Sequence, residues 1–243
     1  LALRWFCGFS LTEATPDHSY FGKLRQRIGA ERMAAVFNRI NDLLKRRGLF
    51  GNVFTFIDAS AIVTKTALWE ERDRAIKDGE TSLNNAVVNK YAADKDARWG
   101  AKSKKNIWFG YKRHHAVDMR HGLIERTTVT PANVLDFKAL HDLCPDQGMV
   151  FTDKLYDCHE ADRILKTHDC HAATIRKRNN PRKQKDLDRW RSRVRMPFEG
   201  VFSKLAKRAR YRGLVKVAFQ NFCQAITHNL KKAVTILPMA IAP

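Results

Sequence analysis

The sequence predicts an α/β protein in which helices pack on the faces of a mixed β-sheet. Five short runs of strand-forming residues are separated by a tight turn or by segments with helical spacing. A hairpin followed by strands that alternate with helices is typical of a mixed sheet. The chain has 243 residues, of which 44% are hydrophobic, so it can build a core of this kind.

The first 50 residues are predicted to be helical, as a segment that precedes the sheet. Thr15, Pro16 and Asp17 form a helix-start signal. Basic residues fill the predicted last turn, and Gly48 follows it as a helix end. One helical face is predicted to carry Met33, Val36, Phe37, Ile40, Leu43 and Leu44.

The first predicted strand is the apolar run VFTFIDASAIV, residues 53–63. Residues 64–105 are polar and charged, and we expect a loop or an extended surface segment there. Two strands then flank the sequence DMRHG, in which Gly122 suits a hairpin turn. A helix capped by Asn133 and a short strand, GMVFTDKLY (148–156), are expected next.

The C-terminal part is predicted to alternate helix and strand before it ends in helices. HEADRILKTHD (159–169) has helical spacing, and HAATIRKR (171–178) resembles a strand. After a basic loop, helices are expected over 196–213 and 214–234. The apolar face of the last helix is predicted to contain Val215, Ala218, Phe222, Ile226 and Leu230.

The charge of the chain predicts an anionic partner. Lys and Arg number 45 against 25 Asp and Glu, which gives a net charge of +20 and an isoelectric point of about 10.1. Such an excess favours a polyanion, most simply a nucleic acid. The alternative, a basic protein without such a partner, stays open from composition alone.

The chain shows no sign of membrane insertion or secretion. No apolar stretch reaches the roughly 18 residues of a membrane span, and the N-terminus lacks a signal-peptide pattern. Five scattered Cys residues are typical of a reducing cytosol rather than a disulfide framework. We therefore expect a cytoplasmic protein without a membrane partner. Because the first residue is Leu1, we also expect that the chain begins inside a longer reading frame.

Two predicted strands each carry an aspartate at or near their C-terminal end, Asp58 and Asp153. In α/β sheets, sites form at the carboxyl ends of strands, where two aspartates would repel each other. A divalent cation such as Mg²⁺ resolves that conflict and suits phosphoryl transfer. Glu199, an isolated acid in a strongly basic region, is the candidate third ligand. The alternatives are capping roles for the aspartates and a surface ion pair for Glu199.

A second group of possible metal ligands is less convincing. Cys158, His159, His168, Cys170 and His171 are residue types that suit zinc. Their spacing matches no zinc-finger pattern, and the adjacent pairs would diverge on a helix or strand. The sequence leaves the role of this cluster open.

Several motifs together resemble the DDE transposases of bacterial insertion sequences, in the insertion-sequence-five group. They include FIDASAI, GMVFTDKLYD, RMPFEGVFSKLAKRARYRG, ITHNLKK and the long block over 94–136. The resemblance spans about residues 10–232. It implies a ribonuclease-H-like fold, here with a mixed five-stranded sheet, and a catalytic Asp-Asp-Glu triad that binds Mg²⁺ or, in its place, Mn²⁺. By motif, the triad is Asp58, Asp153 and Glu199.

The resemblance also implies a division of the chain and marks where it departs from the family. Residues 1–50 would be a truncated helical segment for DNA-end binding or assembly. Residues 51–243 would be the catalytic domain, with a basic insertion near 177–192. Arg195 stands four positions before the Glu, as in the family motif. Three positions depart from that pattern: Leu155 replaces Gly, Ser192 replaces Tyr, and Ala206 replaces Lys.

The expected activity is cleavage and joining of phosphodiesters at the ends of an insertion sequence by in-line displacement. Double-stranded DNA, as terminal repeats and target, would be the partner, bound by a homodimer in the nucleoid. No nucleotide cofactor is expected, because the chain has no GxxxxGK[ST] loop. A catalytically inactive DNA-binding remnant and a nuclease of the same fold remain as alternatives. The residues expected to contact DNA are Lys102, Lys104, Lys105, Lys154, Arg182, Lys183, Lys185, Trp190, Arg195, Lys204 and Lys207.

Overall fold

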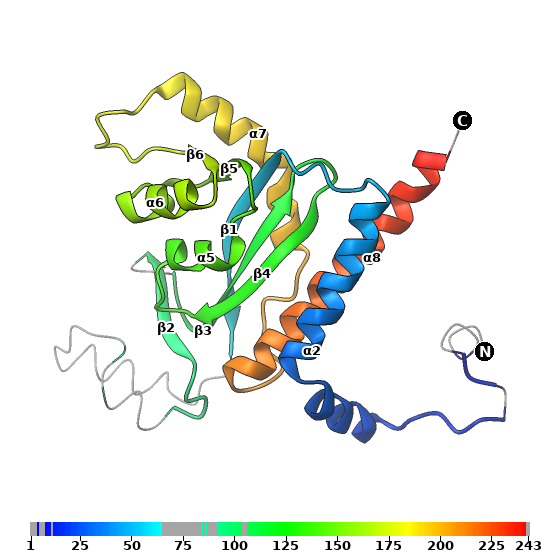
Figure 1. Ribbon diagram of the computed structural model, residues 1–243. Helices are drawn as coiled ribbons and strands as arrows, with labels where there is room; N and C mark the ends of the chain where they lie inside the picture. Colours follow the sequence, from blue (N-terminus) through cyan, green and yellow to red (C-terminus); the bar gives the residue numbers. More distant parts are fainter. Residues whose placement is uncertain are drawn as a thin grey trace.

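A computed structural model describes residues 4, 8–10, 12–64, 84, 86, 92–103 and 106–241. A mixed six-stranded sheet forms its centre, and helices cover both faces of the sheet (Figure 1). The strand order is β2-β3-β1-β5-β6, with β4 paired to β3. A helical segment precedes the sheet, so the predicted ribonuclease-H-like fold class is confirmed, although the sheet has six strands and not the five predicted.

The antiparallel half of the sheet contains β1 (Phe54–Val63), β3 (Asn106–Asp118) and β4 (Leu123–Pro131). As predicted, β3 and β4 form a hairpin, and Gly122 in its turn has φ 71°. The sixth strand, β2 (Arg98–Ser103), lies in the stretch that was expected to be a loop or extended surface segment. It pairs with the first half of β3, and Trp99 packs on Phe109. Backbone pairing and one buried aromatic contact thus outweigh the polar composition.

The parallel half adds β5 (Gly148–Thr152) and β6 (Cys170–Thr174) beside β1. The crossover connections run through η1 (Asp136–Ala139), α5 (Leu140–Leu143), η2 (Lys154–Tyr156) and α6 (His159–Thr167). These short helices cover one face of the sheet, where Ile57 and Val150 share a core with Leu140 and Ile164.

The helix predicted to start at Asn133 was wrong in its boundary. Leu135 occupies the N-cap position of η1, and no side chain caps it. The amide of Ala132 donates to Gly110 O, and that of Val134 donates to Pro131 O. These backbone bonds keep the segment in a turn at the end of β4, so the helical turn begins later.

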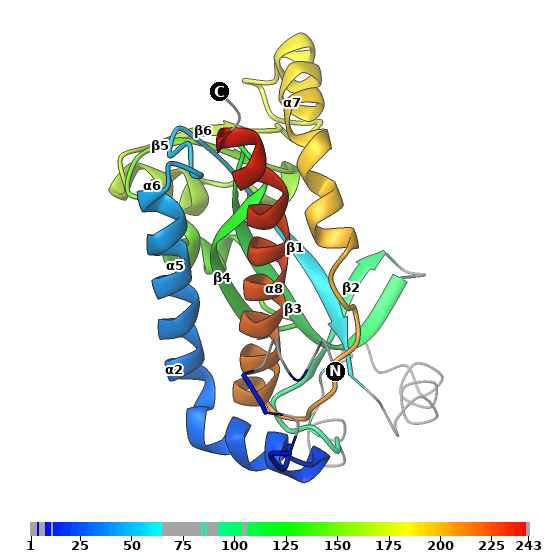
Figure 2. The same ribbon diagram turned by 90° about the vertical axis from the view of Figure 1, so that its right-hand side faces the viewer.

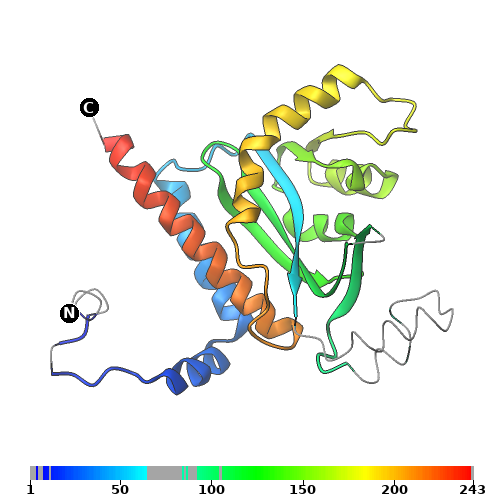
Figure 3. The same cartoon turned by 180° about the vertical axis from the view of Figure 1, so that it is seen from behind.

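Three long helical elements cover the opposite face: α2 (His18–Arg46), which is kinked at Gly29, α7 (Lys185–Ser203) and α8 (Leu214–Ile241). Figure 2 shows α2 and α8 lying side by side, and Figure 3 shows α7 crossing next to β1. Their side chains share one core with the sheet, built from residues such as Phe37, Phe56, Phe202 and Ala225. The N-terminal helix therefore packs directly on the part of the chain that carries the sheet.

Helix α2 starts and ends where the sequence predicted, although its buried face differs. Asp17 is the N-cap and accepts hydrogen bonds from the amides of Ser19 and Tyr20, and Gly48 follows the end with φ 70°. The predicted face was wrong in part, because Val36 and Leu43 are 45% and 49% exposed. Asn41 is buried on that face instead, because its amide group binds backbone oxygens of β4.

The two C-terminal helices differ from the prediction in their bounds. Helix α7 begins at Lys185, inside the expected basic loop, and ends at Ser203. The predicted helical continuation to 213 was wrong. Lys207 O accepts a hydrogen bond from the amide of Val63, and Val63 O accepts one from Ala209, so 207–209 runs extended beside the end of β1.

In α8, the predicted apolar face is rotated from the buried one. Val215 and Leu230 are exposed. The most buried residues of the stripe that faces the protein are Val217, Gln220, Asn221, Ala225, Asn229 and Ala233. Small and amide side chains occupy the centre of this stripe, so large apolar residues at helical spacing mark only its edge. Of the predicted face, Phe222 and Ile226 do pack against the core. No helix in the described part of the chain is long and apolar enough to cross a membrane.

A pair of buried asparagines fastens the two long helices to the sheet. The Oδ1 atom of Asn229 in α8 accepts a hydrogen bond from the Ile124 amide at 2.8 Å, and its Nδ2 atom donates one to Ile124 O at 2.7 Å. It also donates to Asn41 Oδ1 of α2 at 2.8 Å. Replacing Asn229 leaves the Ile124 amide and the Asn41 amide oxygen without these partners in a buried region.

We expect Asn229→Leu to lower the free energy of unfolding by roughly 2–3 kcal/mol, because buried polar groups lose their partners. Urea denaturation measures this change. The neighbouring, half-exposed Leu230 supplies the control, since Leu230→Ala should change stability by less than about 1 kcal/mol. Equal effects of the two substitutions would show that the asparagine pair does not hold α2 and α8 to the sheet.

Candidate active site

The parallel pairing of β1 with β5 places Asp58 beside Asp153. In that register Phe54 lies opposite Met149, and Phe56 lies opposite Phe151. Continued by two residues, the same register puts Asp58 opposite Asp153, with neighbouring strands about 4.8 Å apart. Asp58 lies within β1, which extends beyond β5, and Asp153 directly follows β5 as the N-cap of η2. The prediction that Asp58 lies near the C-terminal end of its strand was wrong, because β1 continues beyond Asp58 to Val63. Asp153 does directly follow its strand, and the shared register still sets the two carboxylates side by side.

Both carboxyl groups are held where ionisation is unfavourable. Burial raises the pKa of Asp58 to about 7, and the nearby charge of Asp153 adds to the rise. Burial also raises the pKa of Asp153, and Asp136 contributes in the same direction. The cations Arg195 and Lys102 oppose these shifts and lower the pKa of each aspartate. A pair of carboxylates with such pKa values favours a bound cation.

Each aspartate keeps one oxygen free of protein hydrogen bonds among the described residues. Asp58 Oδ1 accepts from the Ala59 amide at 2.7 Å, and Asp153 Oδ1 accepts from the Leu155 amide at 2.7 Å. The backbone thus fixes one oxygen of each carboxylate and leaves Oδ2 of each available to a ligand. Hard carboxylate oxygens of this kind are the ligands that Mg²⁺ takes, usually one or two carboxylates with water and phosphate oxygens.

Glu199 lies on α7 and does not join the aspartates directly. Its Oε1 is 3.4 Å from Arg195 Nη2, one helical turn earlier, and its side chain is 51% exposed. Arg195 is only 17% exposed and lies over the ring of Phe56, on the face of β1 that also carries Asp58. Across the part of the chain that the structure describes, no three His, Cys, Asp or Glu residues gather as a metal site. Arg195 is therefore the link between Glu199 and the two aspartates.

Sequence reasoning missed a buried polar group next to the pair. Asp136, the first residue of η1, forms an ion pair with Lys112 at 2.7 Å, and both side chains are largely buried. Its charge acts on Asp153, His114 and the phenol of Tyr156. Asp136 follows a turn rather than a strand, so no strand-end pattern points to it.

The Leu155 departure from the family motif does not distort the backbone. Leu155 lies in the 3₁₀ turn η2, and the positive-φ residues other than Gly are Asn52 and Asp169 in the described chain. A turn with negative φ accepts Leu as well as Gly. The Asp153 carboxylate is therefore held by a turn that the substitution leaves intact.

The residues predicted to contact DNA differ in their availability. Lys102, Lys154, Arg182, Lys185, Lys204 and Lys207 are exposed. Lys183 is held instead by Asp188 at 2.8 Å and by the backbone oxygen of Arg176. Trp190 is half-exposed and its ring lies 5.8 Å from that of Phe151. Lys104 and Lys105 lie outside the described residues.

Comparisons with known proteins agree with this architecture. The family of the transposase DDE domain matches residues 50–230. Over 229 residues, the chain is 31% identical to the transposase for insertion sequence element IS1106 of Neisseria meningitidis serogroup B, with 88% of this chain and 77% of that transposase covered. No solved structure matches the chain. The chain belongs to the DDE transposase family of bacterial insertion sequences.

Proposed function

We propose that this transposase cleaves and joins DNA at the ends of an insertion sequence, with Asp58, Asp153 and Glu199 as its catalytic carboxylates. The observation that carries the proposal is the register of β1 and β5, which, continued by two residues, sets Asp58 within β1 beside Asp153 just after β5. Their raised pKa values and the free oxygen on each support a shared divalent cation.

The chemistry of the donor set agrees with Mg²⁺ or Mn²⁺, which the family generally uses. Asp58 and Asp153 would hold the ion through their second oxygens. When bound, such an ion supplies charge neutralisation for an in-line displacement at phosphorus. The part played by the chain is positioning, because the amides of Ala59 in β1 and Leu155 in η2 fix the carboxylates before substrate arrives.

Glu199 is proposed as the third carboxylate, and Arg195 as the group that positions it. The ion pair holds Glu199 on the side of α7 that carries Arg195. The guanidinium of Arg195 lowers the pKa of both aspartates. In the substrate complex, a DNA phosphate near Arg195 would compete with Glu199 for this cation, because guanidinium groups bind phosphate well. Glu199 would then be free to turn toward the metal.

Double-stranded DNA is the proposed partner, as terminal repeats and as target, bound by a homodimer. Residues 1–50 are proposed as a segment for end binding or assembly, and residues 51–243 as the catalytic domain. A nuclease of the same fold would cut without joining, and an inactive remnant would bind without cutting. The intact aspartate pair and the unstrained turn at Leu155 support the transposase over the remnant.

We expect Asp153→Asn to abolish metal-dependent cleavage while leaving DNA binding intact, because the amide cannot supply the carboxylate charge. A labelled DNA that carries the ends of the element should yield new 3′-hydroxyl ends and joined products with the parent protein in Mg²⁺. Asp146→Asn serves as control, since Asp146 is 89% exposed and pairs with Arg126 at the surface. Loss of binding together with cleavage would make Asp153 structural, and cleavage without joined products would indicate the nuclease.

We expect Mg²⁺ to stabilise the protein more at pH 8 than at pH 6. The pKa of folded Asp58 is raised to about 7 from 3.8. Between pH 3.8 and about 7, the folded state therefore holds a proton on Asp58 that the unfolded state has lost. The free energy of unfolding without metal falls as the pH rises through this range. A bound cation offsets the cost of the buried negative charge. It binds more tightly at the higher pH, because its carboxylate ligands must be deprotonated.

At a hundredfold excess over its dissociation constant, Mg²⁺ should raise the unfolding midpoint by about 5–10 °C at pH 8. Scanning calorimetry measures the shift. Asp58→Asn should remove the response to Mg²⁺ and raise the metal-free midpoint at pH 8, whereas Asp146→Asn should respond like the parent. An unchanged response in Asp58→Asn would place the ion elsewhere.

We expect Glu199→Gln to lower the cleavage rate by at least about 100-fold, the loss typical of removing one group that stabilises developing charge. Binding of the same DNA in EDTA should be unchanged. Glu160→Gln, an exposed position on α6, is the matched control. If Glu199→Gln cleaves normally while Asp136→Asn does not, the buried Asp136 is the third carboxylate and the motif assignment fails.

A further inference from the structure

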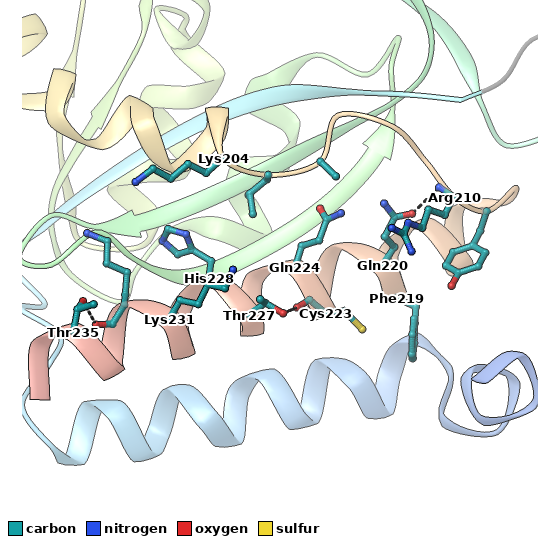
Figure 4. A pocket seen from close by; sticks show the side chains of 14 residues that line it. Lys204, Arg210, Phe219, Gln220, Cys223, Gln224, Thr227, His228, Lys231 and Thr235 are labelled. Carbon is teal, nitrogen blue, oxygen red and sulfur yellow. Dashed lines mark hydrogen bonds between the residues drawn. The ribbon is translucent and has the colours of Figure 1, made fainter. Parts of the chain in front are cut away.

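A groove of about 890 Å³ lies between α8 and the segment that follows α7 (Figure 4). Lys204, the C-cap of α7, stands on one wall, and His228 and Lys231 of α8 stand on the other. Arg210 lies at one end of the groove. The charged residues that line it are Lys204, Arg210, Lys231 and Lys232, and no acidic residue is among the lining residues.

The whole C-terminal part of the sequence is positively charged. From residue 200 to 243 the chain has eight Lys and Arg residues and no Asp or Glu. The cations that line the groove therefore have no carboxylate partner within this part of the chain. Burial lowers the pKa of His228, and the charges of Lys232 and Lys204 lower it further, so cations of both walls act on this one side chain.

The two walls are held together by hydrogen bonds beneath the groove. Arg113 of β3 is buried and donates to Gln224 Oε1 at 2.8 Å and to the backbone oxygen of Ala206. Gln220 accepts from the Arg210 amide at 2.9 Å and donates to Arg208 O at 3.0 Å. These bonds fix the segment against α8, so the groove exists before a ligand binds. Preformed sites avoid the cost of ordering on binding.

The groove also has a defined position relative to the proposed catalytic residues. Lys204 follows the last residue of α7, the helix that carries Glu199 and Arg195. Groove and carboxylates lie on the same face of the sheet, because α7 and α8 share one core there with Phe56. A strand that leaves the carboxylates along α7 would meet Lys204 next.

We propose that this groove binds the sugar–phosphate backbone of DNA next to the phosphodiester that is cleaved, through Lys204, Arg210, Lys231 and Lys232. This inference rests on the proposed function, because it takes DNA as the substrate. Lysines and arginines that neutralise phosphates give affinity without reading sequence. The free amide nitrogen of Gln224 offers a further donor within the groove.

The groove adds three cations to those that the sequence alone indicated. Lys204 was expected to contact DNA, whereas Arg210, Lys231 and Lys232 were not singled out. Because Arg210 lies in the segment 204–213 and Lys231 and Lys232 lie far along α8, only the folded chain brings them to one groove. Their function as backbone contacts predicts a salt dependence that a sequence-reading site would not share.

The test is the binding of a short labelled DNA duplex of arbitrary sequence, measured by fluorescence anisotropy at several salt concentrations in EDTA. Lys231→Gln with Lys232→Gln should weaken binding and lower the slope of log K against log salt by about 2, since each lost phosphate contact removes about 0.9. Arg163→Gln with Lys166→Gln removes the same charge from exposed positions of α6 and should leave the slope unchanged.

The outcomes separate this inference from the proposed function. Parent-like binding by the groove variant, or equal losses in both double variants, would overturn the groove assignment. The Asp153→Asn cleavage assay decides the catalytic proposal independently, because binding here is measured without metal. A groove variant that binds weakly beside an inactive parent would support the groove and reject the catalytic proposal.

A second measurement uses the unaltered protein, so it does not depend on the folding of a variant. Lysine acetylation followed by mass spectrometry should show protection of Lys204, Lys231 and Lys232 when the same duplex is bound. Lys166 on α6 should be modified equally with and without DNA. Protection of Lys166 alone, or of none of these lysines at a DNA concentration that saturates binding, would contradict the proposal.

Discussion

The pairing of β1 with β5 is the constraint on which the candidate site depends. Phe56 and Phe151 lie opposite each other and pack into the same core, and this apolar contact fixes the register two residues before the carboxylates. A slip of one residue would turn Asp58 to the face occupied by Ile57. The register that buries the aromatic pair is thus the register that brings Asp58 to Asp153, so core packing and site geometry have one cause.

The same register brings two carboxyl groups together, and Arg195 of α7 offsets their repulsion only in part. Two adjacent carboxyl groups with raised pKa values destabilise the metal-free fold above neutral pH. The positive charge of Arg195 makes ionisation of the two aspartates less unfavourable, but Arg195 also forms an ion pair with Glu199. The charge of Lys102 also acts on both aspartates, yet burial still leaves the pKa of each carboxyl group raised. A divalent cation would complete the compensation, which ties the stability of this region to the metal that the family uses.

The sequence predicted well wherever one local signal decides the structure. The Asp17 cap, the hairpin at Gly122 and the strands that carry Asp58 and Asp153 follow from turn chemistry and apolar runs. The sequence prediction was wrong where contacts between residues far apart in the chain determine the structure. Helix α7 begins within the basic stretch, at Lys185, where the buried Asp188 forms ion pairs with Lys183 and Arg191. The buried face of α8 relies on asparagines paired across the core, and the relation of Glu199 to the aspartates passes through Arg195.

The distribution of charge along the fold joins these observations. The acids of the candidate site lie on β1, after β5 and on α7, whereas the chain beyond Glu199 carries cations without a single acid. Cations that converge from two fixed walls repel one another, and this repulsion weakens the fold until an anion enters. On the two proposals, the aspartate pair would take a cation and the groove would take an anion. A phosphodiester backbone with a bound metal ion would supply both at once.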